Sequence, residues 1–176
     1  MFAFFESIID PLAPGRDERP PDSLVAFIWH YVRPVWKTLA ALVVVAGIVA
    51  LIEVSLFDFV GRIIDLMKDT PPADLFSEYG VTLLWMAAVV VLLRPLVFAV
   101  HLLIVHQAVE PSLTNLVRWQ THRYVLRQSL GFFQNDFAGR IVTKVWSAGQ
   151  ATGDFMVSLL QVVWFIGIYT ATTMVL

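Results

Sequence analysis

Three long apolar segments dominate the pattern of hydrophobic and polar positions along this chain. They cover residues 35–60, 81–105 and 154–176. Glu53 and Asp58 lie toward the far end of the first segment, and Arg94 and His101 interrupt the second. A bilayer core of about 30 Å needs about 20 helical residues, so each segment is long enough to cross it. The pattern predicts an all-α membrane protein with three transmembrane helices.

The stretch between the second and third apolar segments is polar, rich in arginine and compatible with a helix over most of its length. We expect the second helix to continue past the bilayer to about residue 129, with a kink rather than an end at Pro111. Twenty residues beyond the bilayer form a rod of about 30 Å. The chain then turns through a hairpin at about 129–140 and returns as a helix from about Ala138. A helical excursion of this length predicts a lever or a docking surface.

The N-terminal part is predicted to form a flexible segment, 1–21, followed by a helix at the membrane interface, 22–34. Residues 11–22 are rich in proline and charged residues, so we expect no regular secondary structure there. We expect Arg33 to leave the helical region because it precedes Pro34, and the helix to end there. A simple extension of the first transmembrane helix is the alternative for 22–34. The first residues lack the basic region and cleavage site of a secretory signal peptide.

Composition agrees with a membrane protein, because 58% of the residues are hydrophobic, 15% are charged, and the mean hydropathy is +0.73. Soluble domains are nearer half apolar and a quarter charged. The net charge of −2 offers no case for a nucleic-acid partner. The chain has no cysteine, which excludes disulfides, thiol catalysis and thiolate metal sites.

Basic residues are distributed unevenly among the polar segments, which predicts the orientation of the chain. The link between the first two helices, 61–80, is too short for a domain and holds only Arg62 and Lys68. The N-terminal part and the excursion after the second helix hold Arg16, Arg19, Arg33, Lys37, Arg118, Arg123, Arg127, Arg140 and Lys144. Basic residues favour the cytoplasmic side, so we expect the N-terminus and the hairpin in the cytoplasm. Three spans then leave the C-terminus outside and bury little against each other, so we expect this chain to be part of a longer protein.

The hairpin sequence, from Arg123 to Lys144, resembles the first intracellular loop of ATP-binding cassette (ABC) exporters. In that family a Phe-Phe pair and a polar tip, followed by glycine, form a coupling helix. The resemblance extends from about residue 22 to residue 176 and is strongest to bacterial fused permease/ATP-binding proteins. It implies that residues 35–176 form half of a six-helix transmembrane domain, multi-pass in the bacterial inner membrane.

The resemblance also implies a set of residues that couple the membrane part to a nucleotide-binding domain. These are Phe132, Phe133, Gln134, Asn135, Asp136, Phe137, Gly139 and Arg140. Aromatic anchors suit a docking pocket, and we expect Gly139 to let the chain pack closely as it leaves the coupling helix. The alternative is a bare reverse turn whose phenylalanines lie on the membrane interface. The chain departs from the family at Thr143, Lys144 and Ala148, where a Ser-Arg pair and an acid are common.

Catalysis is not expected from this chain itself. A phosphate-binding loop needs the pattern Gly-x4-Gly-Lys-Ser/Thr, and no glycine here precedes a lysine. The resemblance places ATP and Mg²⁺ in the full-length protein and implies as partners its downstream spans and nucleotide-binding domain, a second half-transporter in a homo- or heterodimer, and the lipid bilayer. Amphiphilic or hydrophobic molecules are the expected substrates. A small non-catalytic membrane scaffold whose hairpin recruits a partner is the alternative.

Arg94 is the main candidate for a residue on the substrate path, because an arginine in a membrane span usually faces a bundle interior or an aqueous cavity. The alternative is an arginine paired with an acid on a helix outside this chain. Trp85, Phe98 and Trp164 are further candidates for contact with an apolar substrate, with ordinary packing as the alternative. Glu53 and Asp58 are expected to be solvated at the outer interface.

Two smaller patterns, one of histidines and one of glycines, bear on metal binding and on helix packing. His101 and His106 form a His-x4-His box of the kind found in membrane di-iron enzymes, but such sites need about eight histidines and this chain has four. Residues five apart on a helix also diverge by about 140°, so we expect no metal site, a packed His101 and an interfacial His106. Gly149 and Gly153 form a small-xxx-small surface that predicts close helix packing.

Overall fold

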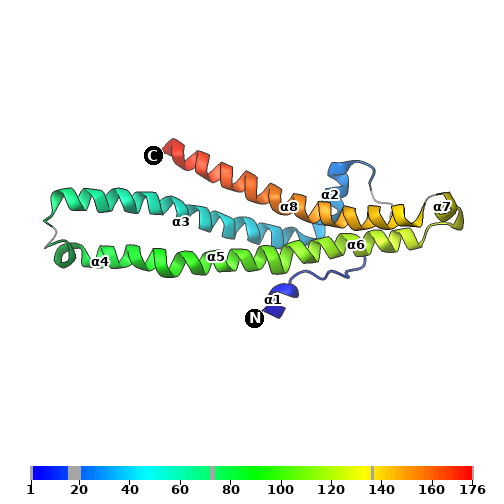
Figure 1. Cartoon of the computed structure of the whole chain (residues 1–176), viewed down its shortest axis with the longest axis horizontal. Helices are drawn as coiled ribbons and strands as arrows, with labels where there is room; N and C mark the ends of the chain where they lie inside the picture. The colour runs from blue at the N-terminus through cyan, green and yellow to red at the C-terminus, as the bar shows by residue number, and fades with distance from the viewer. Residues whose placement is uncertain (1, 16–20, 72–73, 136, 176) are drawn as a thin grey trace. The chain divides into compact units, whose positions relative to one another are not determined.

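The computed structural model describes residues 2–15, 21–71, 74–135 and 137–175, and in these ranges it contains helices and no strand. The α-helices are α1 (Phe2–Glu6), α2 (Leu24–Val32), α3 (Trp36–Asp69), α4 (Leu75–Ala88), α5 (Arg94–Leu103), α6 (Glu110–Leu126), α7 (Leu130–Asn135) and α8 (Ala138–Val175) (Figure 1). One 3₁₀ turn, η1 (Arg33–Val35), and two π-helical segments, η2 (Val89–Leu93) and η3 (Ile104–Val109), join some of them.

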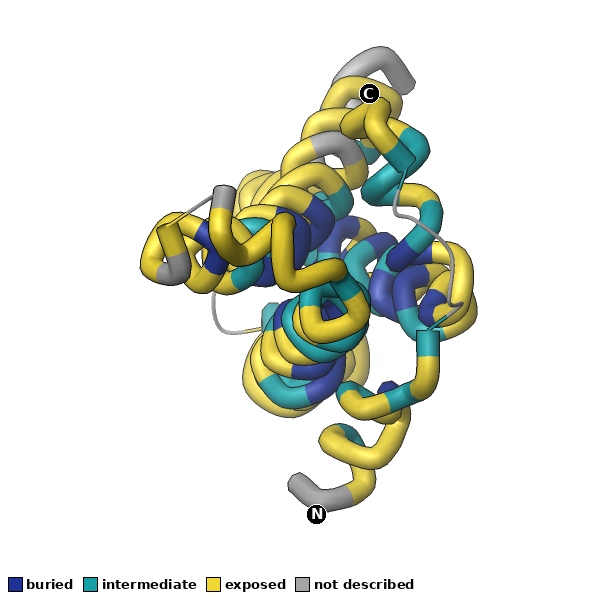
Figure 2. Tube along the Cα trace, turned by 90° about the vertical axis from the view of Figure 1, so that its right-hand side faces the viewer, coloured by how far each residue is buried: buried dark blue, intermediate teal, exposed yellow. Residues whose placement is uncertain are grey.

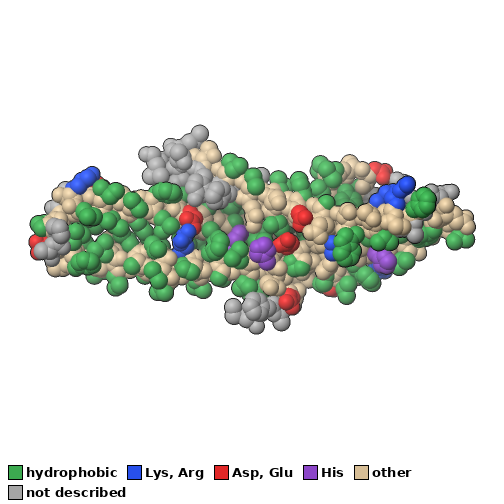
Figure 3. Space-filling view, in the orientation of Figure 1, with side chains coloured by type: hydrophobic (Ala, Val, Ile, Leu, Met, Phe, Trp, Pro, Cys, Tyr) green, Lys and Arg blue, Asp and Glu red, His purple; other side chains and the backbone are tan. Residues whose placement is uncertain are grey.

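Three helical stretches are long and apolar enough to cross a membrane, namely Leu24–Lys68, Leu75–Leu126 and Gly139–Ile168. The predicted all-α membrane fold is therefore confirmed. Hydrophobic side chains cover much of the visible surface (Figure 3), as expected for helices whose outer faces meet lipid rather than water.

The chain divides into two compact units. The first unit contains Met1–Leu42 and Leu103–Leu160, and the second contains Val43–Leu102 and Gln161–Leu176. The first unit has the larger buried core, which centres on Tyr31, Leu42, Val105, Val109, Leu113 and Val117. These side chains are almost completely buried, and Figure 2 marks buried positions along the trace in dark blue and exposed ones in yellow.

The first helix extends beyond its predicted end. Residues 61–69, expected in the outer link, continue α3 to Asp69, so the link is much shorter than 61–80. Ion pairs Arg62–Asp58 at 2.8 Å and Lys68–Asp65 at 3.5 Å join successive turns of this extension. Pairs at this spacing stabilise a helix by about 0.2–0.5 kcal/mol each, which favours the helix over the expected loop.

Proline does not end the second long helix. Pro95 and Pro111 each stand in the first turn of an α-helix that follows a π-helical segment. The N–H of Arg94 bonds to Val89 O, and that of Glu110 bonds to Val105 O, so each bond spans five residues. The wider π turn accommodates a proline ring that otherwise clashes with the carbonyl four residues earlier. The helix continues through Pro111, as the sequence predicted.

The junction at Pro34 differs from the prediction. α2 ends at Val32, with Ser23 as its N-cap, but Arg33 keeps helical angles (φ −51°, ψ −41°). The expectation that Arg33 leaves the helical region was wrong, because Pro34 lies in the first turn of the next helical segment, where its missing N–H is not needed.

The described part of the N-terminal segment, 2–15, belongs to the first unit and contacts α6. Ile9 is only 4% exposed, and the Gln120 side-chain amide donates to the Ala13 carbonyl over 3.3 Å. From the next helix, α2, the Tyr31 hydroxyl lies 3.4 Å from the Thr121 hydroxyl. These contacts brace α6 from two separate segments.

Candidate functional site

The hairpin of the first unit consists of α6, the short helix α7 and the first half of α8. Figure 1 shows α6 and α8 side by side, with α7 at the tip. α6 ends three residues earlier than predicted, at Leu126, and the Gln128 side-chain amide donates back to the Tyr124 carbonyl. The Ser129 carbonyl then accepts from the Phe132 N–H, which opens α7.

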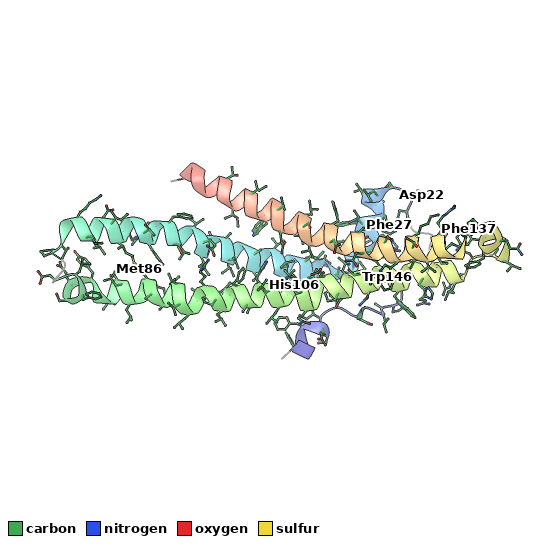
Figure 4. The ribbon with its side chains drawn as sticks, viewed as in Figure 1. Asp22, Phe27, Met86, His106, Phe137 and Trp146 are labelled. Carbon is green, nitrogen blue, oxygen red and sulfur yellow. The ribbon has the colours of Figure 1, made fainter. Side chains whose placement is uncertain are left out.

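The predicted coupling residues gather at this tip. The exposed fractions of the Phe132, Phe133 and Phe137 side chains are 40%, 37% and 78%. The Phe132 and Phe133 rings meet edge to face, with their centroids 5.4 Å apart. The Arg140 guanidinium lies 5.9 Å from the centroid of the Phe137 ring, which Figure 4 shows at the end of the hairpin.

The other predicted coupling residues are Gln134, Asn135, Asp136 and Gly139, and the structure describes them only in part. Gln134 is exposed on α7, and the helical position of Asn135 is described but its side chain is not. Asp136 lies outside the described residues. A Cβ built on Gly139 meets no atom within 4 Å, so packing inside the described chain does not require glycine there. The close packing expected at Gly139 is therefore not found.

Phe133 also occupies a position that the sequence did not reveal. It lines a cavity of about 690 Å³ in the first unit, whose walls also include Trp119, Trp146 and Leu12. The Trp119 indole N–H is buried and has no hydrogen-bond partner among the described residues. The cavity lies between the N-terminal segment and the hairpin helices, so Phe133 contacts the hairpin interior as well as the tip.

Arg118 and Trp146 hold the two arms of the hairpin together. The Arg118 guanidinium stacks on the Trp146 ring at 3.8 Å from its centroid, and its Nη2 donates to Gln150 Oε1 over 2.9 Å. Figure 4 shows Trp146 on α8, facing α6. The sequence indicates Arg118 only as a basic residue expected on the cytoplasmic side, since a cation on α6 does not reveal its partner on α8.

Gly149 and Gly153 let α8 approach α6 closely. A Cβ on Gly149 would lie 2.8 Å from the Thr114 carbonyl oxygen and would overlap the Arg118 side chain. A Cβ on Gly153 would overlap the Thr114 hydroxyl. The predicted small-residue packing surface is confirmed, and its partner is α6.

The second unit contains the predicted substrate-path residue Arg94, which pairs with Glu53. The Arg94 Nε lies 2.9 Å from Glu53 Oε1, and the side chains are 47% and 26% exposed. The pairing corrects two expectations, the acid on a helix outside this chain and the solvated Glu53, and leaves the substrate-path prediction for Arg94 untested. The acid is on α3 of this chain, and Glu53 is paired rather than only solvated. Asp58 pairs with Arg62 instead.

Phe98 and Trp164 come together, and Trp85 does not join them. Phe98 and Trp164 line a cavity of about 340 Å³ in the second unit, together with His101. The Trp164 indole packs over Gly47 of α3, where an added Cβ would lie 3.1 Å from its nitrogen. Trp85 is 65% exposed and does not line this cavity.

The two histidines of the His-x4-His pattern have different surroundings. His101 is buried, and its ring lies 6.4 Å from that of Phe98, with 30° between the planes. His106 is exposed, and its Nδ1 lies 2.8 Å from the Glu110 carboxylate. Among the described residues, no three His, Cys, Asp or Glu side chains lie close enough together to hold a metal ion.

Comparison with known proteins gives one informative similarity. The chain is 30% identical over 178 residues to a protein of Haemophilus influenzae described as an uncharacterized ABC transporter ATP-binding protein. The aligned region covers 98% of this chain, and the chain spans 28% of the length of that relative. No family model and no solved structure matches the chain. The similarity supports an ABC transporter context for this chain.

Proposed function

We propose that this chain is the substrate-path and force-coupling part of an ATP-driven ABC exporter, and that α7 docks on a nucleotide-binding domain. The observation that carries the proposal is the hairpin itself. Its tip presents a six-residue helix with exposed aromatic side chains between two long helices. The similarity to an ABC transporter protein supports the same function.

Phe137 is the strongest anchor for docking, because it is the most exposed aromatic side chain of the tip at 78%. Aromatic side chains that fill a partner's pocket commonly dominate the energy of an interface. Phe132 adds a second apolar contact on α7. The partner surface is therefore an apolar pocket with polar groups at its edge, and it binds ATP and Mg²⁺ elsewhere on the same domain.

The hairpin is built to transmit displacement rather than absorb it. α6 has 17 residues and, at about 1.5 Å per residue, is a rod of about 25 Å. Arg118 and the close glycine contacts fix α8 against it. A movement of the tip on ATP binding is then carried along both arms to the apolar segments, which alternate between two arrangements around the substrate. A second half-transporter completes the path.

The test compares Phe137→Ala with Phe4→Ala in the full-length protein, reconstituted in liposomes. Phe4 is a matched control, since it is 69% exposed and lies outside the hairpin. We expect Phe137→Ala to lower transport and substrate-stimulated ATPase activity at least about tenfold while nucleotide binding is unchanged. Phe4→Ala should leave all three unchanged.

Equal activity in the two variants would refute docking through Phe137. A full-length protein without ATPase activity would refute the exporter function, and the scaffold alternative would take its place.

A further inference from the structure

The Arg94–Glu53 pair uses only a fraction of its hydrogen-bonding capacity. One bond joins Nε to Oε1, and no other partner is found among the described residues for the two Nη groups of Arg94 or for Oε2 of Glu53. A guanidinium can donate five hydrogen bonds, and a carboxylate can accept about four. Both side chains are partly exposed. The pair therefore offers donors and acceptors to a further group.

The surroundings of the pair are apolar. The helical stretches that contain Glu53 and Arg94 are two of the three that are apolar enough to span a membrane. Charged groups with unmet hydrogen bonds are costly in such a place, and they usually mark a path or a binding site. Water or a ligand beside the pair supplies hydrogen-bond partners for these groups.

A cavity lies one helical turn from the pair on both helices. Phe98, four residues after Arg94, and Val49 and Ala50, four and three residues before Glu53, line it. Its volume of about 340 Å³ is within the range of small-molecule sites, and its lining is mostly apolar. The Trp164 indole closes one side. A charged pair and an apolar pocket thus adjoin on the same helices.

We propose that this combined site, formed by Arg94, Glu53, Phe98 and Trp164, binds a zwitterionic amphiphile. Its anionic group, a phosphate or carboxylate, binds the Nη groups of Arg94, and its ammonium group donates to Glu53. Its apolar chain enters the adjoining cavity. This assignment of a substrate class rests on the proposed exporter function.

Charge balance selects a zwitterion over the other amphiphiles. The pair is neutral as a whole, so a ligand with one net charge leaves an uncompensated charge in an apolar region. A neutral head group offers no opposite charge to either side chain, so it forms no ion pair with Arg94 or Glu53. A zwitterion complements both charges and keeps the site neutral.

The test measures binding of amphiphiles that share one brominated dodecyl chain to the full-length protein in nanodiscs without ATP. The head groups are phosphoethanolamine, methyl phosphate, ammonium and maltoside. Bromine quenches tryptophan fluorescence, and Trp164→Phe identifies the quenching that comes from this cavity. We expect phosphoethanolamine to bind about tenfold more tightly than either singly charged head group, the value of one charge-assisted hydrogen bond.

The variants separate the pair from general membrane binding. Arg94→Gln and Glu53→Gln should each abolish the tenfold preference, and the swapped pair, Arg94→Glu with Glu53→Arg, should keep most of it. The matched control is Arg62→Gln with Asp58→Asn, an ion pair on α3 whose residues do not line the cavity formed by Phe98 and Trp164. It should bind like the wild type.

Nanodiscs with and without phosphatidylethanolamine distinguish the source of the ligand. If phosphatidylethanolamine competes with the brominated amphiphile, the site is assigned to a membrane phospholipid. If it does not compete, the site is assigned to a non-membrane amphiphile. Equal binding of all four head groups to the wild type, or an unchanged preference in both single variants, would overturn the assignment. ATPase activity measured in parallel reports separately on the exporter function.

Discussion

Gly149→Ala is the sharpest test of how the hairpin arms are joined. The added Cβ would lie 2.8 Å from the Thr114 carbonyl oxygen, and a backbone atom cannot rotate away. Alanine also stabilises a helix by about 1 kcal/mol relative to glycine, which offsets part of the packing loss. The matched control is Gly167→Ala on the same helix, where the added Cβ meets no atom within 4 Å. The difference between the two variants therefore isolates the packing loss.

Overpacking of this kind costs about 1–3 kcal/mol, so we expect the two variants to differ by that amount in free energy of unfolding. Thermal unfolding of the full-length protein in nanodiscs, followed by tryptophan fluorescence, measures the difference. Gly153→Ala offers an internal check, because its Cβ would overlap the movable Thr114 hydroxyl and Thr114→Ala should rescue it. Equal stability of Gly149→Ala and Gly167→Ala would refute the close approach of α6 and α8.

Two further predictions concern the charged side chains. Arg118→Lys should destabilise the hairpin by about 1–2 kcal/mol and uncouple ATPase activity from transport, because an ammonium cannot both stack on Trp146 and bond to Gln150. Arg118→Ala should lower stability and coupling at least as much as Arg118→Lys. Wild-type stability and coupling in the lysine variant would show that a positive charge alone suffices. In a double-mutant cycle of Arg94→Gln and Glu53→Gln, the double variant should lose less stability than the sum of the single ones, by about 0.5–3 kcal/mol. Additive losses, measured by thermal unfolding, would show that the pair contributes no coupling.

The proposed lever action of the hairpin depends on contacts between segments that are far apart in the chain. Arg118 on α6 has its partners on α8, 28 and 32 residues later, and Gln120 contacts the N-terminal segment. A pattern of residue types predicts which helix face is polar, but the partner of a cation depends on which residues the fold brings opposite it. The same limit applied to Arg94, whose acid lies 41 residues away on α3.

The sequence by itself determined the fold class and the position of the hairpin, because the length and apolarity of a segment are local properties that decide whether a helix can cross a bilayer. It also identified the glycine surface of α8, since spacing along a helix is local as well. The end of α3 and the conformation of Arg33 were predicted wrongly from the sequence. Ion pairs between successive turns extend α3, and Arg33 stays helical because Pro34 lies in the first turn of the next helical segment. Only the tertiary structure paired Arg94 with Glu53, separated Trp85 from Phe98 and Trp164, and placed Phe133 in the wall of the same cavity as Trp146. These arrangements arise from packing between helices far apart in the chain, and packing is a property of facing surfaces rather than of either sequence alone.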